Sequence, residues 1–382
     1  MQNTDMPNDW TVKKLGEFLE ITSCKRVHEA DWTDHGVPFY RARELVALHD
    51  NQPIDPLFIS EDLYLKNTKV SGEIQPGDLL VTGVGTIGVQ YLVKPGDRFY
   101  FKDGNIIWLK NNKKIDGRFL YYSFDNWFIR KQILHDAGVG TVGTYTIDNA
   151  KKTKIMLPPI KEQKKIAEIL GTWDRAIEEL TELITEKKEL RKGLANRLLN
   201  GLMWQDVELS DLLNYEQPTK YLVTEILDYD AQKTPVLTAN KAFILGSTDD
   251  TTGVYSKQDC IIFDDFTTDI KYVDFKFKVK SSAIKILTPK GNVNLKFVFE
   301  QMQRLKLPIG GHKRYWLSEY QYLTIKMPNE DTQSKIVSIL SRADAEIDLL
   351  NQQLDVLKEQ KRGLMQKLLT GEIRVKVDTE AC

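Results

Sequence analysis

A duplication inside the chain constrains its fold more than any other sequence feature. Residues 155–201 and residues 325–371 align without a gap at a constant separation of 170 positions, and 17 of the 47 aligned positions are identical. Both copies begin near a proline, Pro158 or Pro328, and both end at a glycine. Because proline precedes or opens helices and glycine closes them, each copy is predicted to form one long helix.

The apolar residues of both predicted helices follow a heptad pattern over about five heptads. The seam of the first copy comprises Ile166, Leu170, Trp173, Ile177, Leu180, Ile184, Leu194 and Leu198. The seam of the second copy comprises Ile336, Leu340, Ala343, Ile347, Leu350, Leu354, Leu357, Leu364 and Leu368, and Lys361 interrupts it. An amphipathic helix packed on its own domain would give a similar pattern. Two seams in the same register favour pairing of the two helices with each other.

Each long helix follows a globular half. Residues 10–18 resemble residues 207–212 when Leu15 is aligned with Leu209, 194 positions later, so the second globular half is 24 residues shorter than the first. This organisation predicts a first globular domain at 1–154, a central helix at 155–203, a second globular domain at 204–324, a C-terminal helix at 325–375 and a tail at 376–382.

Both globular halves are predicted to be mixed α/β domains of short strands and helices. Short apolar runs bounded by Gly, Asp or Asn indicate strands. Such runs occupy residues 78–82, 90–93, 105–109, 260–263 and 283–287. Residues 117–122 and 295–299 are predicted to begin short helices. The order of the strands does not follow from these patterns.

Charge and cysteine content exclude several classes of protein. The chain has 53 basic and 54 acidic residues, so any binding to nucleic acid must use local patches. Three scattered cysteines without ligand spacing suggest neither a disulfide framework nor a zinc or other metal site. No signal sequence and no apolar run of ~18 residues is apparent, which predicts a reduced, cytoplasmic setting without membrane contact.

Two glycine-rich strings match the Gly-x-Gly-x-x-Gly pattern of dinucleotide-binding sites, at residues 83–88 and 138–143. That pattern binds a pyrophosphate only where its last glycine opens a helix. Both strings lead instead into residues typical of strands, so glycine turns are the favoured interpretation. The sequence also lacks an amino-methyltransferase motif, a P-loop, a zinc-protease motif and a Gly-x-Ser-x-Gly motif, so we predict no catalytic residues and no metal site.

The chain resembles the specificity subunit of type I restriction-modification enzymes over essentially its whole length. The resemblance rests on Pro-x-x-x-x-Gln-x-x-Ile-x-x-Ile-Leu at the start of both helices, which includes Gln163 and Gln333. It also rests on Gly-Leu-x-x-x-Leu-Leu-x-Gly at their ends.

The resemblance implies that each globular half is a target-recognition domain that reads one half of a split DNA sequence. It further implies that the two helices form an antiparallel coiled coil in a pseudo-twofold arrangement, set the spacing between the half-sites, and dock two adenine-methyltransferase subunits. Restriction and translocase subunits would join in the full complex. The chain itself would be non-catalytic and hold no cofactor, with S-adenosylmethionine, ATP and Mg expected only in the partner subunits.

Helix length is consistent with this role. A helix over residues 163–200 would be about 57 Å long at 1.5 Å per residue, compared with roughly 34–36 Å for one turn of DNA. Because the two halves share a frame but differ in content, the predicted target is bipartite and asymmetric double-stranded DNA.

The duplication also indicates which loops would contact DNA. The separation of 170 extends back through Tyr145 and Tyr315, whereas the residues just before them differ completely between the copies. The candidates in these loops and in the turns after the strands at 78–82 and 260–263 are Thr82, Thr86, Thr141, Thr144, Tyr145, Thr267, Thr268, His312, Lys313, Arg314 and Tyr315. An aspartate in the second turn either accepts a hydrogen bond from cytosine N4 or holds the turn, and the second role is favoured.

Basic residues that lack near acidic neighbours along the chain are candidates for phosphate contacts. They are Lys25, Arg26, Arg41, Arg43, Lys151, Lys220, Lys241 and Lys271. An alternative function is a coiled-coil scaffold whose globular halves bind protein without sequence-specific DNA recognition.

Overall fold

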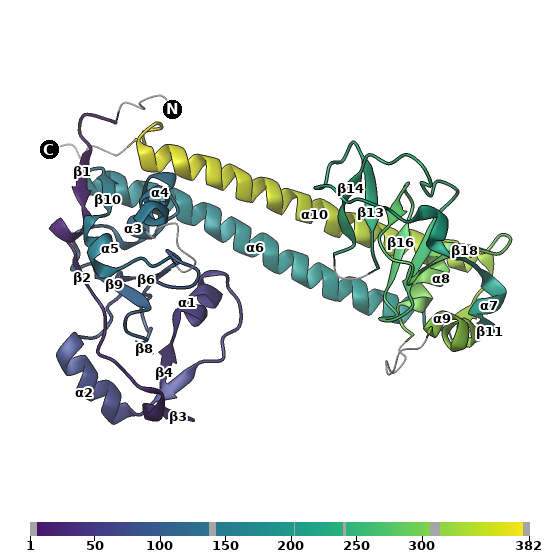
Figure 1. Cartoon of the computed structure of the whole chain (residues 1–382), viewed down its shortest axis with the longest axis horizontal. Coiled ribbons are helices and arrows are strands. Elements are labelled where there is room, and N and C mark those ends of the chain that lie inside the picture. The colour runs from purple at the N-terminus through teal and green to yellow at the C-terminus, as the bar shows by residue number, and fades with distance from the viewer. Residues whose placement is uncertain (1–5, 137–142, 202, 240–241, 306–313, 377–382) are drawn as a thin grey trace. The chain divides into compact units, whose positions relative to one another are not determined.

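The computed structural model describes residues 6–136, 143–201, 203–239, 242–305 and 314–376 (Figure 1). The chain divides into two compact units, Met1–Thr181 with Gln353–Cys382, and Glu182–Gln352. Both boundaries fall inside the long helices α6 (Ile160–Leu198) and α10 (Glu330–Thr370). Each unit therefore contains one globular half together with a part of each long helix.

The described residues of the first unit form three small sheets. Their strand orders are β1-β10, β2-β9-β6-β7 and β3-β5-β4-β8. The strands are β1 (Thr11–Lys14), β2 (Glu20–Thr22), β3 (Trp32–Thr33), β4 (Val37–Tyr40), β5 (Leu57–Ile59), β6 (Leu79–Thr82), β7 (Gln90–Leu92), β8 (Tyr100–Phe101), β9 (Ile106–Lys110) and β10 (Lys154–Leu157). The helices are α1 (Ala42–His49), α2 (Glu61–Ser71), α3 (Gly117–Ser123), α4 (Trp127–Asp136) and α5 (Ile147–Lys152), with short 3-10 turns at Leu15–Glu17 and Glu29–Asp31.

Three sheets are also formed by the part of the second unit that the structure describes. Their strand orders are β11-β19, β12-β18-β15-β16 and β14-β13-β17. The strands are β11 (Gln205–Glu208), β12 (Leu213–Glu216), β13 (Thr234–Leu237), β14 (Ile244–Thr248), β15 (Cys260–Asp264), β16 (Ile270–Val273), β17 (Lys278–Val279), β18 (Ile284–Pro289) and β19 (Thr324–Met327). The helices are α7 (Leu209–Leu212), α8 (Leu295–Met302) and α9 (Tyr315–Ser318), with 3-10 turns at Pro218–Tyr221 and Tyr320–Tyr322.

The outermost strand pairing repeats between the units. Thr11 pairs with Leu157 in the first unit, and Gln205 pairs with Met327 in the second, 194 and 170 positions later. Both pairings are antiparallel, and both bring the start of the globular half to the strand that leads into a long helix. The duplication therefore includes the frame that closes each globular half.

The four-stranded sheets β2-β9-β6-β7 and β12-β18-β15-β16 are the central sheets of the two units. They also correspond to each other, but their equivalent residues lie at other sequence separations. Val81 lies opposite Ile107 in the first unit, and Phe263 lies opposite Lys285 in the second, 182 and 178 positions later. The 24 residues missing from the second half are consequently distributed as 12 between β2 and β6, 4 between β6 and β9, and 8 between α3 and β10. The length differences lie between these shared strands, and the registers of the shared pairings are intact.

The strands and short helices predicted from the sequence are confirmed. The five apolar runs form β6, β7, β9, β15 and β18, and α3 and α8 begin at Gly117 and Leu295. Both helices begin after a capping side chain, because Asp116 accepts a hydrogen bond from the Phe119 backbone and Asn294 accepts one from the Phe297 backbone. Phe119 and Phe297 are fully buried in the cores of their units.

The glutamine at the start of each long helix has a structural reason. Gln163 Nε2 donates to the carbonyl oxygen of Pro158 at 2.9 Å, and Gln333 Nε2 donates to that of Pro328 at 2.8 Å. Both glutamines are buried, so these bonds satisfy an amide that would otherwise lack a partner. The shared entry motif thus fixes the turn that leads into each helix.

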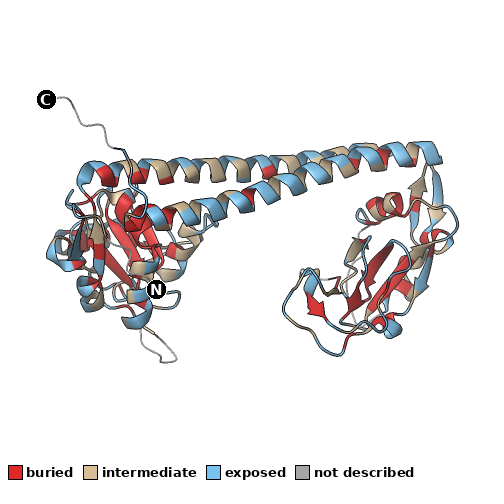
Figure 2. Cartoon of the chain, turned by 90° about the horizontal axis from the view of Figure 1, so that it is seen from above, coloured by how far each residue is buried: buried red, intermediate tan, exposed pale blue. Residues whose placement is uncertain are grey.

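Burial along the long helices follows the predicted seams (Figure 2). The buried seam residues are Ile166, Leu170, Ile184, Ile336, Leu340, Leu354 and Leu368, and every other seam residue is half-buried. Most other positions on both helices are exposed. Among the described residues, no helix is both long and apolar enough to cross a membrane.

In each unit, a basic residue that interrupts the apolar seam of one long helix forms an ion pair with an aspartate of the other long helix. In the first unit, Lys361 Nζ lies 2.5 Å from Asp174 Oδ1. In the second unit, Arg191 Nε lies 2.8 Å from Asp344 Oδ1. Arg191 aligns with Lys361, and Asp344 with Asp174, in the 170-position duplication. Arg191 also contacts the buried Glu300 of α8 at 2.6 Å, so the second pair reaches into its globular half.

We predict that neither Cys24 nor Cys260 reacts with iodoacetamide in the folded protein. Burial raises the pKa of each thiol to about 12, so at pH 8 roughly one thiol in ten thousand is the reactive thiolate. The test is mass spectrometry of the two cysteine peptides after alkylation at pH 8, with and without urea. Equal labelling of Cys260 in both samples would contradict its burial.

Candidate nucleic-acid interface

Equivalent backbone hydrogen bonds hold one turn in each of the two units. In the first unit, the Gly83 backbone N–H donates to the Asn105 carbonyl, and the Gly83 carbonyl accepts from the Tyr145 N–H, both at 2.8 Å. In the second unit, the Asp265 N–H donates to Ala283 at 3.1 Å, and the Asp265 carbonyl accepts from Tyr315 at 3.4 Å. Gly83 and Asp265 are therefore equivalent positions. Each turn is therefore joined by a backbone hydrogen bond to Tyr145 or Tyr315.

The turn of the first unit is built from glycine and a buried threonine. Thr82 Oγ1 accepts from the Val89 N–H at 2.9 Å and donates to the Thr86 carbonyl. A Cβ on Gly83 would lie 2.6 Å from the Tyr145 carbonyl oxygen, so only glycine fits there. The string at 83–88 leads into strand β7 and opens no helix, which confirms the interpretation as a glycine turn. Residues 138–142 of the second string lie outside the described residues.

The turn of the second unit is held by two aspartates. Asp264 Oδ1 accepts from the backbone N–H groups of Phe266 and Thr267 at 2.9 and 3.0 Å. Asp265 accepts from the Trp316 N–H at 2.9 Å and lies 3.0 Å from Lys285 Nζ. Both aspartates hold the turn, as the favoured sequence interpretation predicted.

Three predicted DNA contacts are corrected by burial. Tyr145 and Tyr315 are 2 % and 1 % exposed and belong to the cores of their units, and Thr82 is fully buried. Tyr145 hydroxyl shares a hydrogen bond with Thr153 at 2.7 Å. A side chain enclosed by its own domain cannot reach a base, so these three residues serve the fold. The sequence pattern failed because it shows that a tyrosine is shared but not which way it points.

The other candidates divide by exposure. Lys25, Arg26, Arg43, Thr86, Thr144, Lys151, Lys220 and Arg314 are exposed, and Arg41, Thr267, Thr268 and Lys271 are half-buried. Thr141, Lys241, His312 and Lys313 lie outside the described residues. The candidates that the structure describes and leaves accessible remain predictions.

Some candidate cations already have acidic partners in the fold. Arg26 Nε lies 2.9 Å from Asp103, which is 77 positions away in sequence. Arg41 and Arg43 share the buried carboxylate of Glu44 at 2.7 and 2.6 Å. Burial alone would raise the pKa of Glu44, but the hydrogen bonds from both arginines lower it, so the carboxylate stays charged and orients the two guanidinium groups.

An open pocket beside this frame contains polar residues that the sequence did not single out. It has a volume of about 310 Å³ and is lined by Arg26, Val27, His28, Glu29, Lys102, Asp103, Gly104 and Asn105. Asn105 is also the residue whose carbonyl holds Gly83. Apart from Arg26, which the sequence did single out, the signal was the turn Asp103-Gly104-Asn105 before β9, which resembles any other strand connection.

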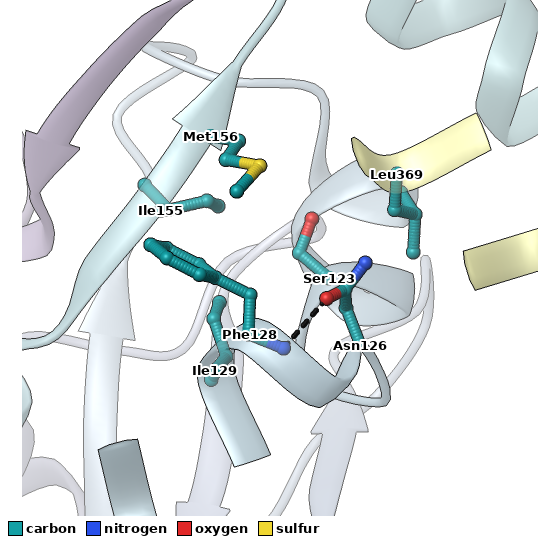
Figure 3. Close-up of a pocket in the computed structure, with 7 residues that line it drawn as sticks. All are labelled: Ser123, Asn126, Phe128, Ile129, Ile155, Met156 and Leu369. Atoms are coloured by element: carbon teal, nitrogen blue, oxygen red, sulfur yellow. Dashed lines mark hydrogen bonds between the residues drawn. The ribbon is translucent and has the colours of Figure 1, made fainter. Parts of the chain in front are cut away.

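A second, much smaller pocket lies where α10 meets the first unit (Figure 3). Its volume is about 10 Å³, which is room for one water molecule, and Leu369 of α10 lies on its wall. Asn126 Oδ1 accepts from the Phe128 N–H at 2.7 Å, while its buried Nδ2 has no partner among the described residues. The size of this pocket fits a structural water rather than a ligand. Within the described part of the chain, no cluster of three or more His, Cys, Asp or Glu could hold a metal ion.

Comparison with known proteins identifies relatives of both halves. Residues 7–190 and 202–359 match the family model for the type I restriction modification DNA specificity domain. A type I restriction enzyme specificity subunit of Escherichia coli is 41 % identical over 196 residues, 47 % of this chain and 48 % of that protein. A Methanocaldococcus jannaschii protein described as a type I restriction enzyme specificity subunit is 24 % identical over 97 % of this chain and 95 % of its own length.

Similarity in fold extends further than similarity in sequence. The crystal structure of a type I restriction-modification system S subunit from M. genitalium matches with a TM-score of 0.60 at 16 % identity, covering 97 % of this chain and 98 % of that one. The alignments with the E. coli protein and with a Haemophilus influenzae relative span only about half the length of each, 48 % and 47 %.

Proposed function

Because the chain belongs to the family of type I restriction-modification DNA specificity proteins, we propose that it recognises a DNA sequence on behalf of a restriction-modification complex. The observation that carries this proposal is the repeated frame with a divergent turn. Gly83 and Asp265 occupy the same hydrogen-bonded position, yet the first turn exposes Gly85 and Thr86 and the second exposes Phe266.

A shared frame with different turns fits a bipartite, asymmetric target. Each globular half presents its turn and the neighbouring segment to one half-site, and different side chains there select different bases. Exposed cations such as Lys25, Lys151 and Lys220 supply phosphate contacts that position each half without selecting a sequence.

The long helices pair in antiparallel fashion, in a pseudo-twofold arrangement, and set the distance between the half-sites. In support, Lys187 pairs with Glu346 and Arg191 with Asp344, so residue numbers rise along α6 as they fall along α10. The 39 residues of α6 correspond to a length of about 58 Å, which exceeds one turn of DNA.

The exposed faces of the long helices are the proposed docking surface for two adenine-methyltransferase subunits, with restriction and translocase subunits in the full complex. Catalysis, S-adenosylmethionine, ATP and Mg belong to those partners in this proposal, and the assembly acts in the cytoplasm. The chain contributes discrimination between sequences. Its near-neutral charge fits a division in which the partners provide much of the electrostatic attraction to DNA.

Deleting this gene from its host is expected to abolish N6-adenine methylation at one bipartite, asymmetric motif, and restoring it is expected to return that methylation. Methylation-sensitive genome sequencing of the parent, deletion and restored strains is the measurement, with the methyltransferase gene intact throughout. The purified complex should then bind the motif with an affinity that falls as salt rises. Unchanged methylation together with no specific DNA binding would favour the protein-binding scaffold.

A further inference from the structure

A large aromatic side chain is exposed on the turn between β15 and β16. Phe266 is 53 % exposed, whereas its neighbour Phe263 is fully buried. The equivalent turn of the first unit carries the small residues Gly85 and Thr86 at its exposed positions. The two units therefore differ in exposed apolar bulk at the tip of the same turn.

The position of Phe266 is fixed by its neighbours. The Phe266 N–H donates to Asp264 Oδ1 at 2.9 Å, and the Thr268 N–H donates to the Asp264 carbonyl at 3.0 Å. Thr268 has a φ of 59°, which a β-branched residue rarely adopts. Strained backbone of this kind persists where the surrounding structure enforces it, and it is concentrated at functional sites.

A buried ion pair lies beneath this turn. Asp265 and Lys285 are each 3 % exposed, and their charged groups are 3.0 Å apart. The other oxygen of Asp265 accepts from the Trp316 N–H, two residues after the exposed Arg314. One carboxylate therefore joins the turn that carries Phe266 to the segment that carries Arg314.

The first unit has no such pair at the equivalent positions. Gly83 stands in place of Asp265, and Ile107 stands in place of Lys285. The common fold thus forms without these charges. Removing two charges from water is unfavourable, and their retention in one unit indicates a role in arrangement rather than in folding.

We propose that Phe266 is a specificity-determining residue that makes an apolar contact with bases of one half-site, and that the Asp265–Lys285 pair positions it together with Arg314. This inference rests on the proposed function. An aromatic ring contacts thymine methyl groups and base edges, whereas arginine bonds guanine, so the second unit presents both chemistries from one anchored site. The first unit, with threonine at its turn, contacts its half-site through hydroxyl groups.

The test uses the full-length chain in complex with its methyltransferase partner and double-stranded DNA carrying the motif found by methylation sequencing. Binding is compared with duplexes in which one or the other half-site is scrambled. Phe266→Ala is expected to reduce the preference for one half-site about 10-fold and to leave the other unchanged. Phe266→Leu, which keeps apolar bulk, should stay within about 3-fold of wild type.

Tyr229→Ala is the matched control, because Tyr229 is a comparably exposed aromatic on a different loop of the same unit. It should leave both preferences unchanged. Full retention of both preferences by Phe266→Ala, or equal losses in Phe266→Ala and Tyr229→Ala, would overturn the inference. Absence of any preference for the motif in the wild-type complex would instead refute the proposed function.

The positioning role of the Asp265–Lys285 pair is tested with a separate set of variants. The double variant Asp265→Gly with Lys285→Ile places the residues of the first unit in the second, and it should lose preference for the same half-site as Phe266→Ala. Adding Phe266→Ala to it should cause little further loss, because both changes act on one contact. Lys285→Arg should retain most of the preference. A folded double variant with wild-type preference would show that the pair does not position Phe266.

Discussion

Replacing Lys285 with isoleucine is expected to destabilise the second unit by about 3–5 kcal/mol. The change leaves Asp265 buried without its counter-charge, and the remaining Trp316 N–H contact does not compensate for that charge. Hydrogen exchange of β15 and β18 measures the effect locally, which suits a chain of two units that need not unfold together. Faster exchange should appear in these strands and not in β6 and β9 of the first unit.

The control for this prediction is provided by the duplication. Adding Asp265→Gly to Lys285→Ile removes the unpaired charge and reproduces the Gly83 and Ile107 of the first unit. The double variant is expected to recover most of the lost stability. If it were as unstable as the single variant, packing of the lysine side chain, rather than its charge, would account for the loss.

Replacing Arg191 with methionine is expected to destabilise the second unit by a similar amount, about 3–5 kcal/mol. Glu300 is 3 % exposed, and Arg191 is its partner at 2.6 Å. Burial alone would lower the pKa of Arg191, but hydrogen bonds to Asp344 and Glu300 raise it above its ordinary value, so the guanidinium stays charged. Hydrogen exchange of α8 and of the C-terminal part of α6 measures the loss.

Lys361→Met is the matched control for Arg191→Met, because the two cations align in the duplication. Lys361 and Asp174 are 21 % and 41 % exposed, so water screens their interaction. Loss of this pair should change stability by less than about 1 kcal/mol. Equal effects of the two variants would contradict the view that the buried Glu300 makes the difference.

Helices, strands and turns were predictable because their signals are local. Proline and glycine bounded the long helices, and short apolar runs marked five strands of the two central sheets. The interruption at Lys361 and its alignment with Arg191 were visible in the sequence, but the ion pairs with Asp174 and Asp344 became apparent only in three dimensions.

The candidate site was less predictable, because contact and burial depend on distant parts of the chain. Arg26 lacked an acidic neighbour in sequence, yet the fold brings Asp103 to it. Tyr145 and Tyr315 were conspicuous as shared residues, and the shared feature proved to be a core position. Phe266 was missed because an aromatic residue beside a buried strand usually continues the core.

The ion pairs between the long helices also affect the register in which these helices pair. A heptad seam of similar apolar residues permits one helix to slip along another by seven residues with little loss of apolar contact. Such a slip would carry Asp344 about 10 Å from Arg191, which would then lose its second carboxylate. In the proposed pairing of the two helices, these ion pairs therefore oppose a slip by one heptad.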